Sequence, residues 1–341
     1  MKLENKRNDF IDFLKGVGIF LVILGHHENW ITGWIYSFHM PLFFMLAGVF
    51  HKNEDKYFDF FKKKVKSLLV PYLFFAIILF LFWLIIGRRF GESAINNTPI
   101  KECFIGILYG DEIKGISSME WGIPIWFLLC LFLISNIFYF VSKLDLKKVI
   151  FIEIFFIIIS AISKKYIPIP LPWNFQRALI DISFYTIGYY MKDFIKNKNK
   201  KYSMITLIKG IFFILMNILI YLNRDKLNIL EKYNINLVYL IGGVFGSFGI
   251  IEILKNIKSN KKIEFLGKNS IILLAFHGRA MTVIKFIFII LLNKTLIEGS
   301  VLIDMVYSIF QVIICIPAIL IINKYFYFCI GKNIRNNFLL K

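Results

Sequence analysis

The chain has 341 residues, of which 58% are hydrophobic and 18% are charged. A soluble domain carries roughly 25% charged residues, so this composition excludes an ordinary soluble protein. The net charge of +19 does not indicate a nucleic-acid-binding protein, because basic residues in short cytoplasmic loops of a membrane protein account for it. Four widely spaced cysteines without a Cys-x-x-Cys suggest neither a disulfide framework nor a zinc site.

The apolar runs predict an all-α fold, a polytopic membrane protein with about ten transmembrane helices in a single domain, residues 1–341. A run of about 17–25 apolar residues can cross a hydrocarbon core about 30 Å thick. The first run is followed by polar residues and not by a small-residue cleavage site, which favours a retained span over a signal peptide. The expected spans are 10–26, 35–50, 68–87, 125–141, 149–162, 178–191, 204–222, 237–253, 270–292 and 301–323.

The distribution of Lys and Arg between these spans predicts that both termini are cytoplasmic. With the N-terminus inside, the cytoplasmic segments hold 26 Lys and Arg, and the opposite segments hold 11. This asymmetry follows the positive-inside rule and predicts a multi-pass protein of a cell membrane, such as a bacterial inner or plasma membrane. Before the third span, the segment 53–69 alternates aromatic residues and lysines. It predicts an amphipathic helix at the cytoplasmic interface, with a solvated charged loop as the alternative.

The first span carries three ionisable residues, which are costly within a membrane. Asp12 and Lys15 are three residues apart and can pair on one helix face. Lys15 and His26 are eleven residues apart, almost three turns, so they project from the same face about 16 Å apart along the axis. Gly16 and Gly18 would let another helix or a ligand approach the backbone closely.

The second span runs back from the outer side and places His39 at about the depth of His26. Two imidazoles from adjacent spans are therefore expected to converge. The alternative for each histidine alone is an interfacial side chain that bonds a neighbouring helix. His27 and His51 lie at span ends and are interpreted as interfacial. His26, His27 and His39 have the ligand type of a metal site, but the paired carboxylates or histidines that would complete one are missing, and no metal is expected.

Further polar residues lie in later spans. His277 and Arg279 fall well inside the span 270–292, where such residues mark a polar cavity by default. Arg177 and Asp181 lie at the outer entrance of their span, where a mutual salt bridge and a substrate role are equally good interpretations. Trp126 lies at the outer interface, either as a member of the aromatic belt or as a substrate contact.

The opening of the chain, "RNDFIDFLKGVGIFLVILGH" followed by "FHMPLFFMLAGVF", resembles the acyltransferase 3 family of integral membrane acyltransferases, and most of all its fucose 4-O-acetylase-like branch. The family's first-span motif is a basic residue, ten residues and a histidine, which fall here on Lys15 and His26. Its next hallmark falls on 39–48. A Trp-Phe-Leu segment at 126–128 and "SFYTIGYYM" at 183–191 also match. Beyond residue 50 the match is mostly one of pattern, and the family's ten-span core agrees with the expected count.

The resemblance implies an O-acetyltransferase that uses acyl-CoA, usually acetyl-CoA, as donor substrate without a tightly bound cofactor. The acceptor would be a carbohydrate hydroxyl on a surface polysaccharide or its precursor. Lys15, with Asp12 beside it, would then face the donor phosphates. His26 would deprotonate the hydroxyl, with His39 in support. Trp126, Arg177, His277 and Arg279 would be substrate contacts. Direct acylation of the histidine is a variant of this mechanism.

Two other classes of function compete with the enzyme. A transporter or flippase for a glycan or lipid-linked sugar would also place charges within the membrane, but the paired repeats with broken helices that are typical of transporters are not visible. A passive scaffold would leave the intramembrane Lys15, His277 and Arg279 unexplained. Turnover of acyl-CoA separates the enzyme from both.

Overall fold

The computed structural model describes residues 8–89, 96–167, 169–199, 201–227, 236–288 and 299–331, and in these ranges the regular structure is helical, without a strand. The chain divides into two compact units. The first unit comprises Met1–His51 and Phe184–Cys315, and the second comprises Lys52–Ser183 and Ile316–Lys341. Helices α10 (Phe175–Tyr190) and α17 (Val301–Tyr325) contribute residues to both units.

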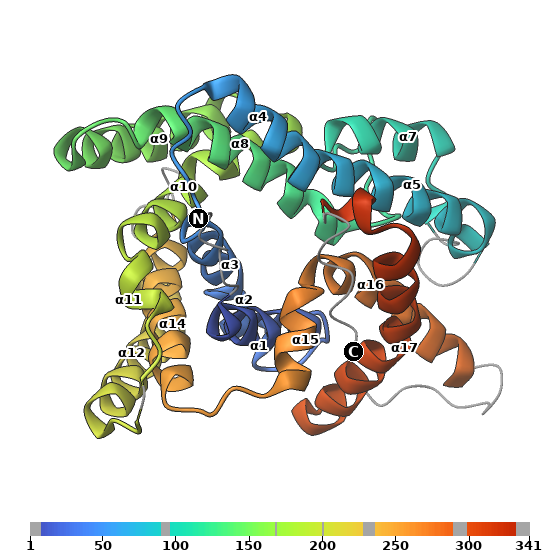
Figure 1. Cartoon of the computed structure of the whole chain (residues 1–341). Helices are drawn as coiled ribbons and strands as arrows, with labels where there is room; N and C mark the ends of the chain where they lie inside the picture. Colours follow the sequence, from blue (N-terminus) through green and yellow to red (C-terminus); the bar gives the residue numbers. More distant parts are fainter. Residues whose placement is uncertain are drawn as a thin grey trace, which may run out of the picture. The chain divides into compact units, whose positions relative to one another are not determined.

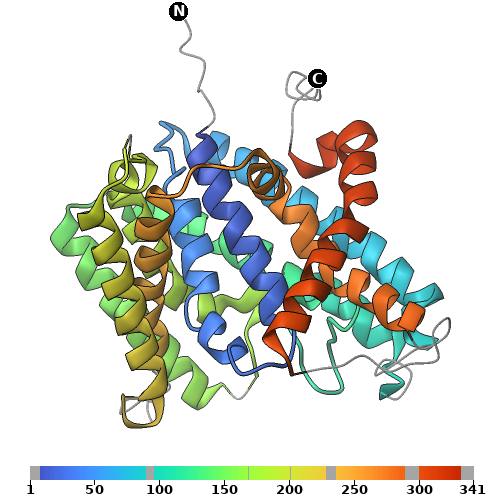
Figure 2. The same cartoon turned by 90° about the horizontal axis from the view of Figure 1, so that it is seen from below.

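The first unit is built around α1, whose start is capped by Asn8, since the Asn8 Oδ1 accepts from the backbone N–H of Ile11 at 3.1 Å. Helices α12 and α14 lie side by side in both views (Figures 1 and 2). Besides parts of α10 and α17, this unit contains α1 (Asp9–Gly25), α2 (Thr32–Tyr36), α3 (His39–Gly48), α11 (Lys192–Lys196), α12 (Met204–Leu222), α13 (Arg224–Leu227), α14 (Leu237–Lys255), α15 (Lys261–Lys268) and α16 (Ser270–Phe286).

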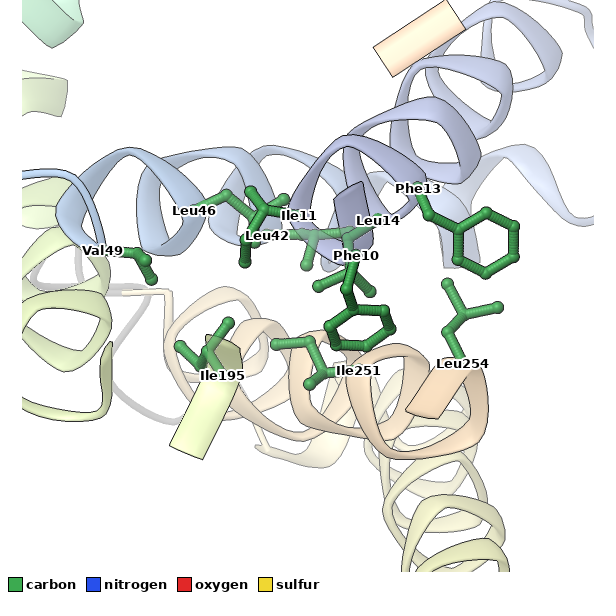
Figure 3. Close-up of a cluster of buried hydrophobic side chains, with 10 residues drawn as sticks. All are labelled: Phe10, Ile11, Phe13, Leu14, Leu42, Leu46, Val49, Ile195, Ile251 and Leu254. Carbon is green, nitrogen blue, oxygen red and sulfur yellow. The ribbon is translucent and has the colours of Figure 1, made fainter. Parts of the chain in front are cut away.

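A cluster of buried apolar side chains joins α1 to α3, α11 and α14 (Figure 3). Burying one such side chain contributes about 1.5–3 kcal/mol relative to leaving it exposed. The cluster consists of Phe10, Ile11, Phe13, Leu14, Leu42, Leu46, Val49, Ile195, Ile251 and Leu254. It fixes the first half of α1, the half that contains Lys15.

Glycines allow the closest helix contacts of this unit. A Cβ atom at Gly16 would collide with the backbone carbonyl of Ile263 in α15, and one at Gly267 would collide with the carbonyl of Asp12. The expected close approach of another helix at Gly16 is therefore confirmed. In the same way, a Cβ atom at Gly188 of α10 would collide with the Met45 carbonyl of α3.

In the second unit, the helix expected in 53–69 exists, but it runs without a break into the third expected span. Residues 57–85 form α4 (Tyr57–Lys64), a π-helical turn η1 (Val65–Leu69) and α5 (Val70–Ile85) in succession. Besides these elements and parts of α10 and α17, the unit contains η2 (Gly87–Arg89), α7 (Ile100–Tyr109), η3 (Ile123–Ile125), α8 (Trp126–Val141), α9 (Leu146–Tyr166), η4 (Pro172–Asn174) and η7 (Tyr327–Ile330).

Each of the ten expected spans coincides with helix, and α2 and α3 share the range 35–50. In the part of the chain that the structure describes, five helices are long and apolar enough to cross a membrane by length and composition: Tyr57–Arg89, Ile123–Val141, Met204–Leu222, Val238–Lys255 and Val301–Tyr325. The count of ten spans and the orientation stay predictions. The termini expected in the cytoplasm, 1–7 and 332–341, and residues 289–292 of the ninth span lie outside the described residues.

Candidate functional site

The end of α1 presents two histidines in succession. The helix ends at Gly25, and the backbone N–H of His26 still bonds the Ile23 carbonyl at 3.2 Å. The turn that follows is held by the Thr32 hydroxyl, which donates to the carbonyl of His27. The two imidazoles therefore leave the helix on a fixed turn, His26 as an exposed side chain and His27 as a buried one.

His26 meets His277 of α16. Their ring centroids are 4.8 Å apart, with an angle of 44° between the ring planes. His277 is 1% exposed. Its Nδ1 lies 3.0 Å from the Leu273 carbonyl oxygen and 2.9 Å from that of Leu274. Both histidines belong to the first unit, so the structure brings together two site residues that lie far apart in the sequence.

His26 and His39, the two imidazoles that were predicted to converge, each contact the ring of Tyr36. The Tyr36 ring centroid lies 6.1 Å from that of His26 and 5.1 Å from that of His39. His39 is buried, and its Nδ1 lies 2.9 Å from the Ile35 carbonyl oxygen. A carbonyl oxygen only accepts, so Nδ1 carries the hydrogen and fixes the orientation of the ring. This placement suits a supporting residue.

His27, expected at the interface, is buried in a polar network instead. Its Nε2 lies 2.9 Å from Gln311 Oε1, and its Nδ1 lies 3.8 Å from the Asp304 carboxylate. The Gln311 amide nitrogen donates to the backbone carbonyl of His277 at 3.0 Å. Asn29 donates to the other Asp304 oxygen at 2.8 Å. The network thus connects the end of α1 to α17 and to the backbone at His277.

Sequence reasoning missed Asp304 and Gln311. Both are buried, and with Ser308 they stand at positions i, i+4 and i+7 of an apolar helix. That spacing places three polar side chains on one helix face. Polar residues inside a span face the protein interior, so this spacing was the signal that could have identified them.

Near the middle of α1, on the helix face that also carries His26, Lys15 is half-buried and its Nζ lies 4.8 Å from the centre of the Phe50 ring. Lys196 Nζ lies 5.8 Å from the same ring. Phe50 is 45% exposed, whereas Asp12 is buried. Lys15, Lys196 and Phe50, named here the basic cluster, offer two cations and a flat apolar ring to a ligand.

Other lysines fix the surroundings of the basic cluster. Lys198 donates to Ser259 at 2.9 Å, and desolvation lowers the pKa of its ammonium group. Lys261 bonds Glu264 at 3.0 Å and Asp9 at 3.3 Å, and these hydrogen bonds, that to Glu264 first, raise the pKa of Lys261. The start of α1 is therefore tied both to α15 and, through Asn8 and the Lys196 carbonyl at 3.2 Å, to α11.

His51 is also buried rather than interfacial. Its Nδ1 lies 2.9 Å from the Tyr185 hydroxyl, and its ring meets the edges of Tyr185 and Tyr189. These tyrosines belong to the "SFYTIGYYM" segment. The aromatic segment thus has a structural role, since it holds the chain that follows Phe50.

The candidates of the second unit form a stack. The Arg177 guanidinium lies 4.3 Å from the centre of the Trp126 ring, and its Nε lies 3.6 Å from the buried Asp181. The predicted salt bridge is therefore present, with a cation–π contact in addition. Trp126 and Arg177 are half-buried.

Arg279 follows His277 by two residues on α16. Two residues correspond to about 200° around a helix, so the two side chains leave α16 on nearly opposite faces. Arg279 is half-buried. The structure brings His277 to the ring of His26.

Among the described residues, no group of three or more His, Cys, Asp or Glu is arranged to hold a metal ion. What His26 and the basic cluster offer is acid–base chemistry and anion binding. Imidazole nitrogens can exchange protons near neutral pH, and lysines attract phosphate as point charges.

A family model described as an acyltransferase domain matches residues 8–322, and the matched range includes both units. A search of curated proteins found no match, and a search of solved structures found none either.

Proposed function

The chain belongs to the acyltransferase 3 family, and we propose that it is a membrane O-acyltransferase that moves an acetyl or other short acyl group from cytoplasmic acyl-CoA to a sugar hydroxyl. The acceptor would be a cell-surface polysaccharide or its precursor. The opening motif, with Lys15 and His26 at its ends, supports the fucose 4-O-acetylase-like branch. The protein would act in a cell membrane such as a bacterial inner membrane.

The observation that carries this proposal is the pair of chemistries on one unbroken helix. Lys15, near the middle of α1, stands in the basic cluster, and His26 caps the end of α1 beside His277. The rise of an α-helix separates the two by about 16 Å. Coenzyme A has the matching design, because its phosphates and its thioester lie at opposite ends of a long flexible arm.

The basic cluster is the proposed docking place for the anionic end of the donor. Lys15 and Lys196 would neutralise phosphate charge. The partly exposed Phe50 ring lies 4.8 Å from Lys15 Nζ and 5.8 Å from Lys196 Nζ. Stacking on an aromatic ring is worth about 1–3 kcal/mol for a nucleic-acid base, and the adenine of coenzyme A is such a base.

His26 is the proposed general base. A ring nitrogen takes the proton of the sugar hydroxyl, and the oxygen attacks the thioester carbonyl carbon. The carbon–sulfur bond then breaks, coenzyme A leaves as a thiolate, and the thiolate recovers the proton from His26. His39 supports the site through Tyr36. Trp126, Arg177 and Arg279 are proposed acceptor contacts, and Asp12 a neighbour of the donor site.

The proposal is tested with purified protein and with cells. Purified protein incubated with acetyl-CoA and glycan from the producing cells should release free coenzyme A thiol, which a transporter or scaffold would not do. Cells with and without the protein should differ in O-acetyl groups on their surface glycans by NMR. Equal O-acetylation together with no thiol release would refute the enzyme assignment.

A further inference from the structure

In the His277 ring, Nδ1 is hydrogen-bonded and Nε2 is not. A carbonyl oxygen accepts and never donates, so the Nδ1 beside the Leu273 and Leu274 carbonyls carries the hydrogen. In the neutral ring Nε2 is then the acceptor. Among the described residues nothing donates to this buried atom. A buried acceptor without a donor destabilises the protein unless a ligand supplies the missing hydrogen bond.

A molecule that donates to His277 Nε2 would lie close to His26, because the two ring centroids are 4.8 Å apart. His26 is exposed, whereas His277 is buried. The backbone at His277 is held by Gln311, which donates to the His277 carbonyl at 3.0 Å. The acceptor atom is therefore fixed in place before any ligand arrives.

A single hydroxyl cannot serve both imidazoles, because it has one hydrogen to donate. If the hydroxyl that is acylated gives its hydrogen to His26, the hydrogen bond to His277 must come from a second hydroxyl. Neighbouring hydroxyls of a sugar ring are separated by a few ångströms, on the scale of the distance between the two rings.

We propose that His277 Nε2 accepts a hydrogen bond from the hydroxyl next to the one that is acylated, so that the acceptor of this enzyme is a vicinal diol on a sugar ring. His277 thereby determines which of the two hydroxyls reacts. The proposal rests on the proposed function, since it takes His26 as the base. No proton is transferred to His277 in this role; it binds and orients.

The test compares O-acetyl positions on glycans from cells that produce the wild type, His277→Ala or His277→Gln. NMR at mildly acidic pH reads the positions, because acetyl groups migrate between neighbouring hydroxyls in alkali. A glutamine retains an acceptor oxygen near the place of Nε2, so His277→Gln should keep the acetyl position. His277→Ala should spread the acetyl group over both positions, with a selectivity loss of about 3- to 10-fold, equivalent to one hydrogen bond.

Gly278→Ala is the matched control, because the next residue of α16 is exposed and nothing lies within 4 Å of the added methyl group. It should leave the pattern unchanged. If His277→Ala does not accumulate in the membrane, His277→Asn replaces it, because its shorter side chain brings no acceptor to the place of Nε2: acetyl groups spread over both positions support the proposal, and the wild-type position contradicts it.

Two results would overturn the inference alone: an unchanged position and amount in His277→Ala, as expected if only water occupies the site, or an acetylated hydroxyl without a hydroxyl neighbour. Identical O-acetylation in cells with and without the wild-type protein would instead contradict the proposed function, and the inference with it.

Discussion

Single side chains determine the properties of the candidate site, because several of its polar groups are buried in an apolar protein. His27, Asp304 and Gln311 are buried and satisfy one another, whereas His277 has an acceptor atom that no described residue satisfies. Lys15 is half-buried beside an exposed aromatic ring. In the proposed function the first set positions the site, and the other two groups are the proposed ligand contacts.

Lys15 should act on the donor. Lys15→Ala should raise the KM for acetyl-CoA with a smaller effect on kcat, because a phosphate contact far from the thioester contributes to binding of ground state and transition state alike. Lys15→Arg should keep much of the activity, since it keeps the charge.

Steady-state kinetics with varied acetyl-CoA measures this. Lys258→Ala, an exposed lysine on the same predicted side, is the control. An unchanged acetyl-CoA dependence in Lys15→Ala would exclude the donor role. Loss of folded protein in both Lys15 variants would indicate a structural pair with Asp12.

The residues of the first helix were predictable from the sequence, and their partners were not. The shared helix face of Lys15 and His26 follows from their spacing and from helix geometry, so a role could be proposed for each of them. The meeting of His26 with His277 depends on the packing of distant helices. Spans that are apolar all round carry no periodic signal for which face packs where.

At the scale of helices, α1 is the element on which the site is built. Its backbone touches α15 at Gly16 and Gly267, and its end is tied to α17 and to the backbone of α16 through His27 and Gln311. The apolar run 10–26 was enough to predict α1 itself. The helices that pack against α1 were indicated only weakly, by its glycines and by the polar face of 301–323.

Gly16→Ala should destabilise the protein by more than about 1 kcal/mol. The new methyl group would collide with the backbone carbonyl of Ile263, which cannot move aside by changing a side-chain rotamer. Gly278→Ala should be neutral or stabilising, since alanine is about 1 kcal/mol better than glycine within a helix and the position is open.

Thermal unfolding of the two variants in detergent compares them directly. A Tm of Gly16→Ala equal to that of the wild type would show that α1 and α15 are not in backbone contact.

Gln311→Leu should lower the Tm as well, because it leaves the Nε2 of His27 and the carbonyl of His277 without their partner, at about 1–3 kcal/mol for each buried group. Val306→Ala, at an exposed position of the same helix, should change the Tm little. Equal stability of both variants would contradict the network.

For the whole molecule, contacts within each unit join segments that the sequence predicts on the same side of the membrane, and the alternation of the spans stays a prediction. In the first unit, the start of α1, the segment 192–203 and the segment 254–269 contact one another. In the second unit, the predicted outer loops meet, since Tyr109 and Trp173 donate across them to the carbonyls of Pro170 and Leu108. The helical class was predictable from composition; the division into two units was not, because no linker marks it.

The orientation is tested by labelling single cysteines from outside intact cells. Lys114→Cys and Asn197→Cys are both exposed positions, in the predicted outer loop and in the predicted cytoplasmic loop. A Cys329→Ser background removes the native cysteine that is partly exposed. An impermeant maleimide should label position 114 and not position 197. Labelling of position 197 alone would show that the orientation is the opposite of the predicted one.

The central claim is that His26 performs the proton chemistry of an acyl transfer. The most direct measurement is acetyl-CoA turnover, with glycan acceptor present, by purified wild type, His26→Ala and His39→Ala, each checked for monodisperse elution. General acid–base help is worth about 10²- to 10⁴-fold, so His26→Ala should lose nearly all turnover while remaining folded. His39→Ala should lose less, because it acts through Tyr36. Near-normal turnover in folded His26→Ala would contradict the account.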